Sequence, residues 1–200
     1  MKAMNGLYMN NLEEIKQYAS TLYKLFYPYC IAIYLGGSRV NPYIKNPGDI
    51  DLILFTKNHN DKFKLNRMVA GYLKKKYDKT PIKNKDGIYD LIQIRNKEKE
   101  EHSYGSFINK QMIHLVGENI NFEFDIIDKD KEEYIKIIKE APSKFHDNKR
   151  YYQLYYGLCI MKNRSYELNE KQIYILNVLH DKTDDYLNYI ENIKIEINKL

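Results

Sequence analysis

Two short groups of residues have the types and spacing to hold a phosphate and a divalent cation together. The first, Gly37 and Ser38, follows the apolar run of residues 30–35. A glycine turn lets the backbone come close to a phosphate, and a helix that starts there offers N–H groups and the positive end of its dipole. Ser38 adds a hydroxyl to the same anion site. Such turns are common, so this group alone is weak evidence.

The second group, Asp49 and Asp51, begins an apolar stretch that ends at Phe55 and is predicted to be a strand. Residues at i and i+2 of a strand project from the same face. Two adjacent carboxylates repel each other and lose hydration, so a fold keeps them where a cation lies between them. Carboxylate, water and phosphate oxygens are the ligands that Mg²⁺ prefers. Aspartates that merely face water are the simpler alternative, but the fixed offset from Gly37 and Ser38 favours a metal site.

The order Gly-Ser, ten intervening residues (39–48), then Asp-x-Asp and an apolar strand resembles the signature of the DNA polymerase beta-like nucleotidyltransferases. Arg39 gives the Gly-Ser-Arg form of the small bacterial and archaeal members, whereas Gly48 stands where a serine often precedes the first aspartate. These motifs cover residues 30–95. The resemblance implies a third carboxylate on a neighbouring strand. It also implies one or two Mg²⁺ ions, for which Mn²⁺ could substitute, held by the three carboxylates.

Two aspartates compete for the place of the third carboxylate. Asp90 lies in residues 88–95, a predicted strand in which its neighbours Tyr89 and Leu91 would point the other way. Asp125 lies in the extended stretch 121–127, which comes after a further predicted helix. We favour Asp90 and leave Asp125 open.

The resemblance implies an enzyme that moves a nucleoside monophosphate, with AMP from ATP favoured, onto a hydroxyl or phosphate of an acceptor. Its metal ligands and catalytic residues would be Asp49, Asp51 and Asp90, and its nucleotide-binding residues Gly37, Ser38 and Arg39. Asp90 would complete the second metal site and accept the acceptor's proton. Arg39 could equally form a structural salt bridge.

The acceptor is open, because an RNA end, a protein side chain and a small molecule all fit. The basic stretch of residues 62–85 mildly favours nucleic acid, although a solvated helix face accounts for it equally well. The alternative function is a catalytically inactive nucleotide- or RNA-binding module that retains the fold. Three crowded carboxylates argue against that alternative, because an inactive domain has no need of them.

The elements that must position these residues follow from the apolar spacing. Helical spacing predicts helices over residues 11–27, 62–77 and 103–115, and short apolar runs predict strands over 30–35, 49–55 and 88–95. After residue 127 every period is helical, with breaks at Asn163-Arg164 and Asp181. We therefore predict an α+β fold: a small mixed sheet flanked by helices as the catalytic core (1–127), and a C-terminal helical bundle (128–200).

The composition sets the class of protein. The chain has 200 residues, 44% hydrophobic and 30% charged, with a net charge of +5, which is typical of a globular protein. No run approaches the ~20 apolar residues of a membrane span, and the N-terminal residues lack a signal peptide's apolar run. Cys30 and Cys159 stand in apolar contexts far apart and are expected to be reduced. Together these features predict a cytoplasmic protein with no membrane partner.

Overall fold

The protein folds as two compact units, and one short segment between two parts of the first unit belongs to the second. The computed structural model describes residues 12–45, 47, 50–77, 92–97, 112–122, 151–183 and 185–199. The sheet unit comprises Met1–Val40 and Gly48–Phe124, and the helical unit comprises Asn41–Pro47 and Asp125–Leu200. The chain therefore passes into the helical unit after Val40 and returns at Gly48. The predicted division at residue 127 includes no such crossing.

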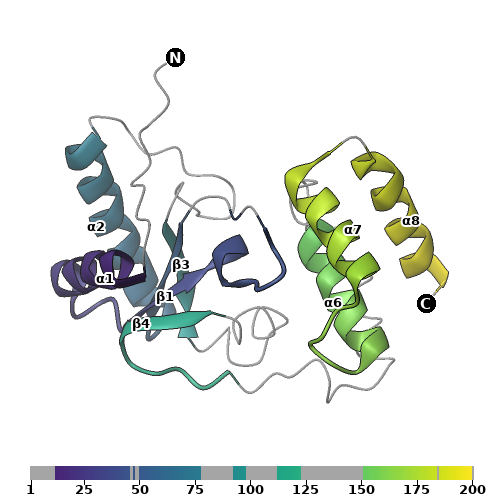
Figure 1. The fold of residues 1–200 in the computed structure, drawn as a ribbon. Helices are drawn as coiled ribbons and strands as arrows, with labels where there is room; N and C mark the ends of the chain where they lie inside the picture. The colour runs from purple at the N-terminus through teal and green to yellow at the C-terminus, as the bar shows by residue number, and fades with distance from the viewer. Residues whose placement is uncertain are drawn as a thin grey trace. The chain divides into compact units, whose positions relative to one another are not determined.

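A four-stranded mixed sheet is the centre of the sheet unit (Figure 1). Its strands are β1 (Ala32–Gly36), β2 (Asp51–Thr56), β3 (Ile92–Asn96) and β4 (Ile113–Gly117), in the order β3-β2-β1-β4. β1 runs antiparallel to both of its neighbours, whereas β2 and β3 are parallel. With five α-helices in the described part of the chain, the fold is α+β with a small mixed sheet, as predicted.

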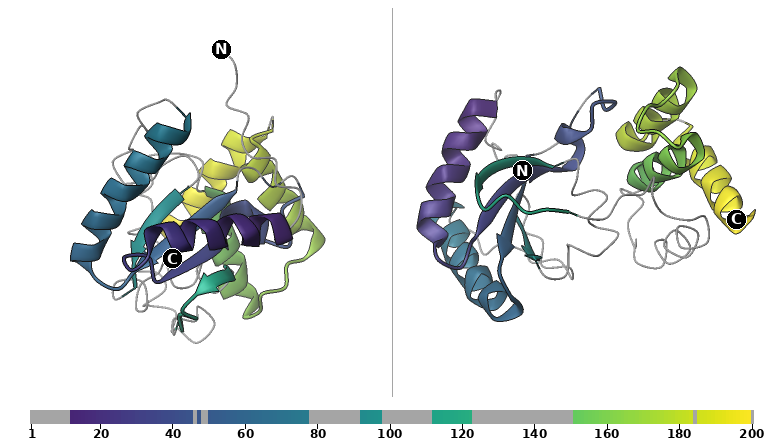
Figure 2. Two further views of the ribbon diagram at one scale, coloured as in Figure 1. Left: turned by 90° about the vertical axis from the view of Figure 1, so that its left-hand side faces the viewer. Right: turned by 90° about the horizontal axis from the view of Figure 1, so that it is seen from below.

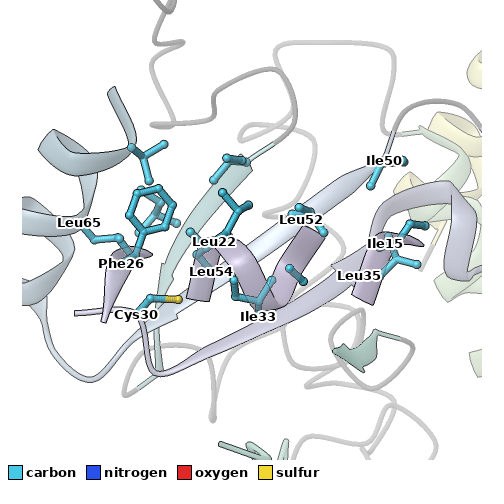
Figure 3. Close-up of a cluster of buried hydrophobic side chains, with 14 residues drawn as sticks. Ile15, Leu22, Phe26, Cys30, Ile33, Leu35, Ile50, Leu52, Leu54 and Leu65 are labelled. Carbon is cyan, nitrogen blue, oxygen red and sulfur yellow. The ribbon is translucent and has the colours of Figure 1, made fainter. Parts of the chain in front are cut away.

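Helices α1 (Leu12–Phe26) and α2 (His59–Tyr77) cover one face of this sheet (Figure 2). The buried residues of α1 are those that the helical spacing predicts: Ile15, Ala19, Leu22 and Phe26. They pack with Leu65 of α2 against side chains from every second position of β1 and β2 (Figure 3). Those positions include Ile33, Leu52 and Leu54, which are at most 1% exposed. We call this side of the sheet the helix face.

The other side of the sheet, which we call the second face, has its own core. Ala32, Tyr34, Ile53 and Phe55 lie there with Met112, Ile120 and Phe122. The antiparallel register pairs Tyr34 with Ile53 and Gly36 with Asp51. Since side chains alternate along a strand, Asp51 belongs to the second face together with Ile53.

The described part of the helical unit contains three helices: α6 (Tyr151–Asn163), α7 (Glu170–Asp181) and α8 (Tyr186–Lys199) (Figure 1). α6 ends where the sequence predicts a break, and Arg164 after it has a φ of 50°. α7 begins with a capping box between Asn169 and Gln172, and ends at Asp181 as predicted. Lys162 Nζ and Glu196 Oε2, 2.8 Å apart, join α6 to α8. None of the described helices is long and apolar enough to cross a membrane.

Several element boundaries differ from the sequence expectation. α2 begins at His59 rather than residue 62, because Asn58 Oδ1 accepts a hydrogen bond from Asp61 N (3.0 Å) and caps the helix. The predicted helix over 103–115 is wrong at its end, since residues 113–115 belong to β4. Apolar side chains at positions 112, 113, 115 and 116 fit a helical period, but pairing with the edge of β1 fixes them as a strand. Residues 103–111 lie outside the described ranges.

Candidate functional site

The turn that follows β1 requires glycine. β1 ends at Gly36, and Gly37–Val40 form one 3₁₀ turn. Gly37 has a φ of +69°, in the left-handed region that side-chain-bearing residues rarely adopt. The predicted glycine turn after a strand is therefore present, but a single 3₁₀ turn stands where the start of a helix was expected. With only four residues in the helical turn, phosphate binding here would depend on backbone N–H groups and the Ser38 hydroxyl rather than on a helix dipole.

Asp51 lies directly against this turn. It pairs with Gly36 across the antiparallel ladder, and its carboxylate lies over the Cα of Gly37. A Cβ added to Gly37 would be 2.7 Å from Asp51 Cγ and would overlap Oδ2. Gly37 is thus needed both for its backbone angle and for the space that the carboxylate fills. The fold brings Gly37 of the first group and Asp51 of the second together at one end of β1 and β2.

The residues next to Gly37 and Asp51 in the sequence differ in how deeply they are buried. Ser38 is buried, with 7% of its surface exposed, and Arg39 is half-buried. Ile50, which precedes Asp51, is buried on the helix face with Leu52. The alternation of β2 therefore extends back to residue 50 and keeps Asp51 on the second face. Asp49, the first aspartate of the predicted pair, lies outside the described residues.

Neither candidate for the third carboxylate, Asp90 or Asp125, lies within the described residues. β3 does lie beside β2 and parallel to it, as a neighbouring strand that supplies this carboxylate should, with Leu52 paired to Ile92. Even-numbered residues of β3 (Ile92 and Ile94) are buried on the helix face. An even-numbered carboxylate can therefore share a face with Asp51 only if the alternation changes before Ile92.

Sequence reasoning missed two polar residues of β3 that share the second face with Asp51. Gln93 pairs with Ile53, and Arg95 with Phe55. Arg95 Nη2 donates a hydrogen bond to Gln93 Oε1 (3.0 Å). The apolar–polar alternation of residues 92–95 was the available signal. Both residues lie further along the sheet than Asp51, so Gln93 is the nearer of the two to the turn.

The chemistry of the described side chains fits a hard cation only in part. Asp51 supplies carboxylate oxygens, which suit Mg²⁺. Within the ranges that the structure describes, no group of three or more His, Cys, Asp or Glu residues could hold a metal ion. Of the three predicted ligands, Asp51 is the only one in those ranges.

The two cysteines are unsuited to metal binding or nucleophilic chemistry at neutral pH. Burial raises the pKa of the Cys30 thiol to about 12, and Cys30 Sγ donates to Ala32 O at 3.4 Å. Burial likewise raises the pKa of Cys159 to about 11. A thiol must lose its proton to act as a ligand or nucleophile, so both residues serve as core side chains.

The described part of the basic stretch of residues 62–85 lies on the helix face of the sheet, opposite to the face that Asp51 occupies. Lys64 and Arg67 are on α2, which covers the helix face of the sheet (Figure 2). Leu65 and Val69 of α2 are buried in the core on that face. Lys64 lies 4.0 Å from Asp61 and over the ring of Tyr29, 5.0 Å from its centroid. These contacts match the solvated helix face that the sequence offered as the plainer interpretation.

The chain was compared with protein families, curated proteins and solved structures. No family model, no curated protein and no solved structure matches the chain.

Proposed function

We propose that this protein is a metal-dependent nucleotidyltransferase of the polymerase beta type. It would move a nucleoside monophosphate, with AMP from ATP favoured, onto an acceptor hydroxyl or phosphate. The observation that carries the proposal is the packing of the Asp51 carboxylate over Gly37, at the end of two antiparallel strands. This arrangement is not needed to end a strand stably. Gly37 has a left-handed backbone conformation, and the Asp51 carboxylate fills the space that a side chain at position 37 would take.

Adjacency is what the proposed chemistry requires. A cation that neutralises triphosphate oxygens must be held beside the groups that bind those oxygens. Gly37 N–H and Ser38 would bind phosphate, Arg39 would contribute positive charge, and Asp51 would hold Mg²⁺. Asp49 and Asp90 would complete the ligand set, and Asp90 would also take the acceptor's proton. When bound, Mg²⁺ would offset the charge that develops as pyrophosphate leaves.

The acceptor is less constrained than the nucleotide. The sequence argument for nucleic acid depends on residues 62–85, and α2 carries their described part on the helix face. That face is opposite to the one that Asp51 occupies, so the basic residues of α2 give no reason to prefer RNA. An RNA end, a protein side chain and a small molecule remain equal candidates.

The test is transfer of label from each α-labelled nucleoside triphosphate, with Mg²⁺ or Mn²⁺, into separated RNA, protein and small-molecule pools. The protein should label one pool in a metal-dependent manner. Asp51→Asn keeps the side chain's shape and removes its charge, and should reduce transfer by more than about 100-fold.

The matched control is Asp61→Asn, the same change on α2 in the same unit, where the Asp61 carboxylate lies 4.0 Å from Lys64 Nζ. It should transfer label at the unaltered rate. Full activity of Asp51→Asn would refute the proposal. Absence of label from every pool with the unaltered protein would favour the inactive binding module instead.

A further inference from the structure

The segment that connects the two halves of the candidate site belongs to the other unit. Gly37–Val40 form the turn, and Asp51 begins β2. Between them, Asn41–Pro47 pack with the helices of the helical unit. The chain between the turn and β2 therefore includes a segment that belongs to the helical unit.

One side chain of α7 holds the segment by its backbone. Asn177 Nδ2 donates a hydrogen bond to Tyr43 O (2.8 Å), and Asn177 Oδ1 accepts one from Lys45 N (2.9 Å). The amide thus pairs with residues 43 and 45 as a neighbouring strand would. Its second N–H donates to Ile173 O (2.8 Å), one turn back in α7, which fixes the orientation of the amide.

Further contacts fix the same segment. Tyr43 Oη donates to Tyr166 O (3.1 Å), and the Tyr43 ring meets the ring of Tyr156 edge-on, 6.1 Å between centroids. Asn41 Oδ1 accepts a hydrogen bond from Tyr43 N (3.0 Å), and Ile44 N donates to Asn41 O (3.3 Å). Asn41 and Ile44 are 8% and 7% exposed. The segment is folded as a turn and anchored to α6, to α7 and to the loop between them.

We propose that Asn177 is a positioning residue for the candidate site, acting through the segment that it holds. Asn41 follows the phosphate-binding turn directly, so a displaced segment would displace the turn. The other end of the segment leads to the predicted metal ligands Asp49 and Asp51. The roles of the turn and of the aspartates in this inference rest on the proposed function. The hydrogen bonds that hold the segment are independent of it.

The kinetic test compares Asn177→Ala with Asn192→Ala, an exposed asparagine on α8. Lys45 is exposed, so water can replace the partner of its N–H and Asn177→Ala should still fold. Its kcat should fall by about 10- to 100-fold, as expected when reacting groups shift by about 1 Å. Its Mg²⁺ requirement should rise, because displaced carboxylates bind the cation less tightly. Asn192→Ala should change neither quantity.

A second measurement decides the inference without reference to activity. Backbone hydrogen exchange of Gly37–Val40 and of residues 41–45 should be faster by about 10-fold or more in Asn177→Ala than in Asn192→Ala. Faster exchange at residues 41–45 with unchanged exchange at Gly37–Val40 would overturn the positioning role, and so would unchanged exchange at both. Either result holds whether or not the protein transfers nucleotide. An unaltered protein that lacks activity would sink the proposed function, while exchange at Gly37–Val40 would still decide whether Asn177 orders the turn. Unchanged kcat and Mg²⁺ dependence in an active Asn177→Ala would remove the inference and leave the function standing.

Discussion

The two faces of the sheet differ in the side chains that strand β2 contributes to them. On the helix face, β2 contributes Leu52 and Leu54 to a continuous apolar core with α1 and α2 (Figure 3). On the second face the same strand contributes Ile53 and Phe55, and then ends in a carboxylate at Asp51. The alternation of one strand therefore separates the residues that stabilise the unit from the residue that could do chemistry. Substitutions on the two faces should have different kinds of effect.

The largest effect on stability should come from the helix face. Leu54 is fully buried, so Leu54→Ala removes packed atoms and leaves a cavity beneath α1 and α2. It should lower the free energy of unfolding by about 2–5 kcal/mol, measured by denaturant titration followed by circular dichroism. Asp51→Asn should change that free energy far less, because it alters no buried apolar contact. Nucleotide transfer per folded molecule should be reduced more by Asp51→Asn than by Leu54→Ala.

The opposite pattern would contradict this division between the faces. If Asp51→Asn destabilised the protein as much as Leu54→Ala, the Asp51 carboxylate would be a structural group of the strand end. Loss of transfer in that variant would then reflect unfolding rather than chemistry. Measuring stability and transfer on the same preparations separates the two explanations.

The third carboxylate offers the next largest effect and sharpens the account of the second face. We expect Asp90→Asn to lower transfer by more than about 100-fold, as loss of a metal ligand should, and Asp125→Asn to have little effect. Neither change should alter stability as Leu54→Ala does. Labelled-nucleotide transfer at saturating Mg²⁺ measures both variants side by side.

The reverse result would have a specific structural meaning. Ile92 and Ile94 place the even-numbered positions of β3 on the helix face. A large loss in Asp125→Asn, with activity retained in Asp90→Asn, would assign the ligand to Asp125. It would also indicate that the alternation of β3 continues back to residue 90 and directs Asp90 away from the face that Asp51 occupies.

Local patterns in the sequence were sufficient for much of the fold. The spacing of Ile15, Ala19, Leu22 and Phe26 predicted the buried side of α1, and the structure confirms it. The end of α6 and the end of α7 also lie where the sequence placed them. In each case neighbouring residues contain the information, either as a period of apolar side chains or as a break in that period.

Features that depend on distant partners could not be predicted in this way. Ile113 and Leu115 have apolar side chains whose spacing from Met112 and Val116 suits a helix, and pairing with the edge of β1 makes this stretch a strand. The contact of Asn177 with Tyr43 joins residues 134 positions apart, and nothing local to either residue indicates it. The Gly37 and Asp51 motif was visible as a spacing, but their direct contact depends on the antiparallel pairing of β1 with β2.

The smallest expected effect on transfer distinguishes the two neighbouring glycines at the end of β1. Gly37→Ala places a side chain at a φ of +69° and in the space of the Asp51 carboxylate, and should cost about 1–3 kcal/mol of unfolding free energy. In Gly36→Ala the new Cβ would be 2.5 Å from Ile53 Cδ1, the movable end of a side chain, so the cost should be about 1 kcal/mol. Thermal unfolding measures both. Because only Gly37→Ala displaces Asp51, it should also lose about 10-fold or more in transfer relative to Gly36→Ala. Equal transfer by the two variants would mean that the Gly37–Asp51 contact serves the turn alone.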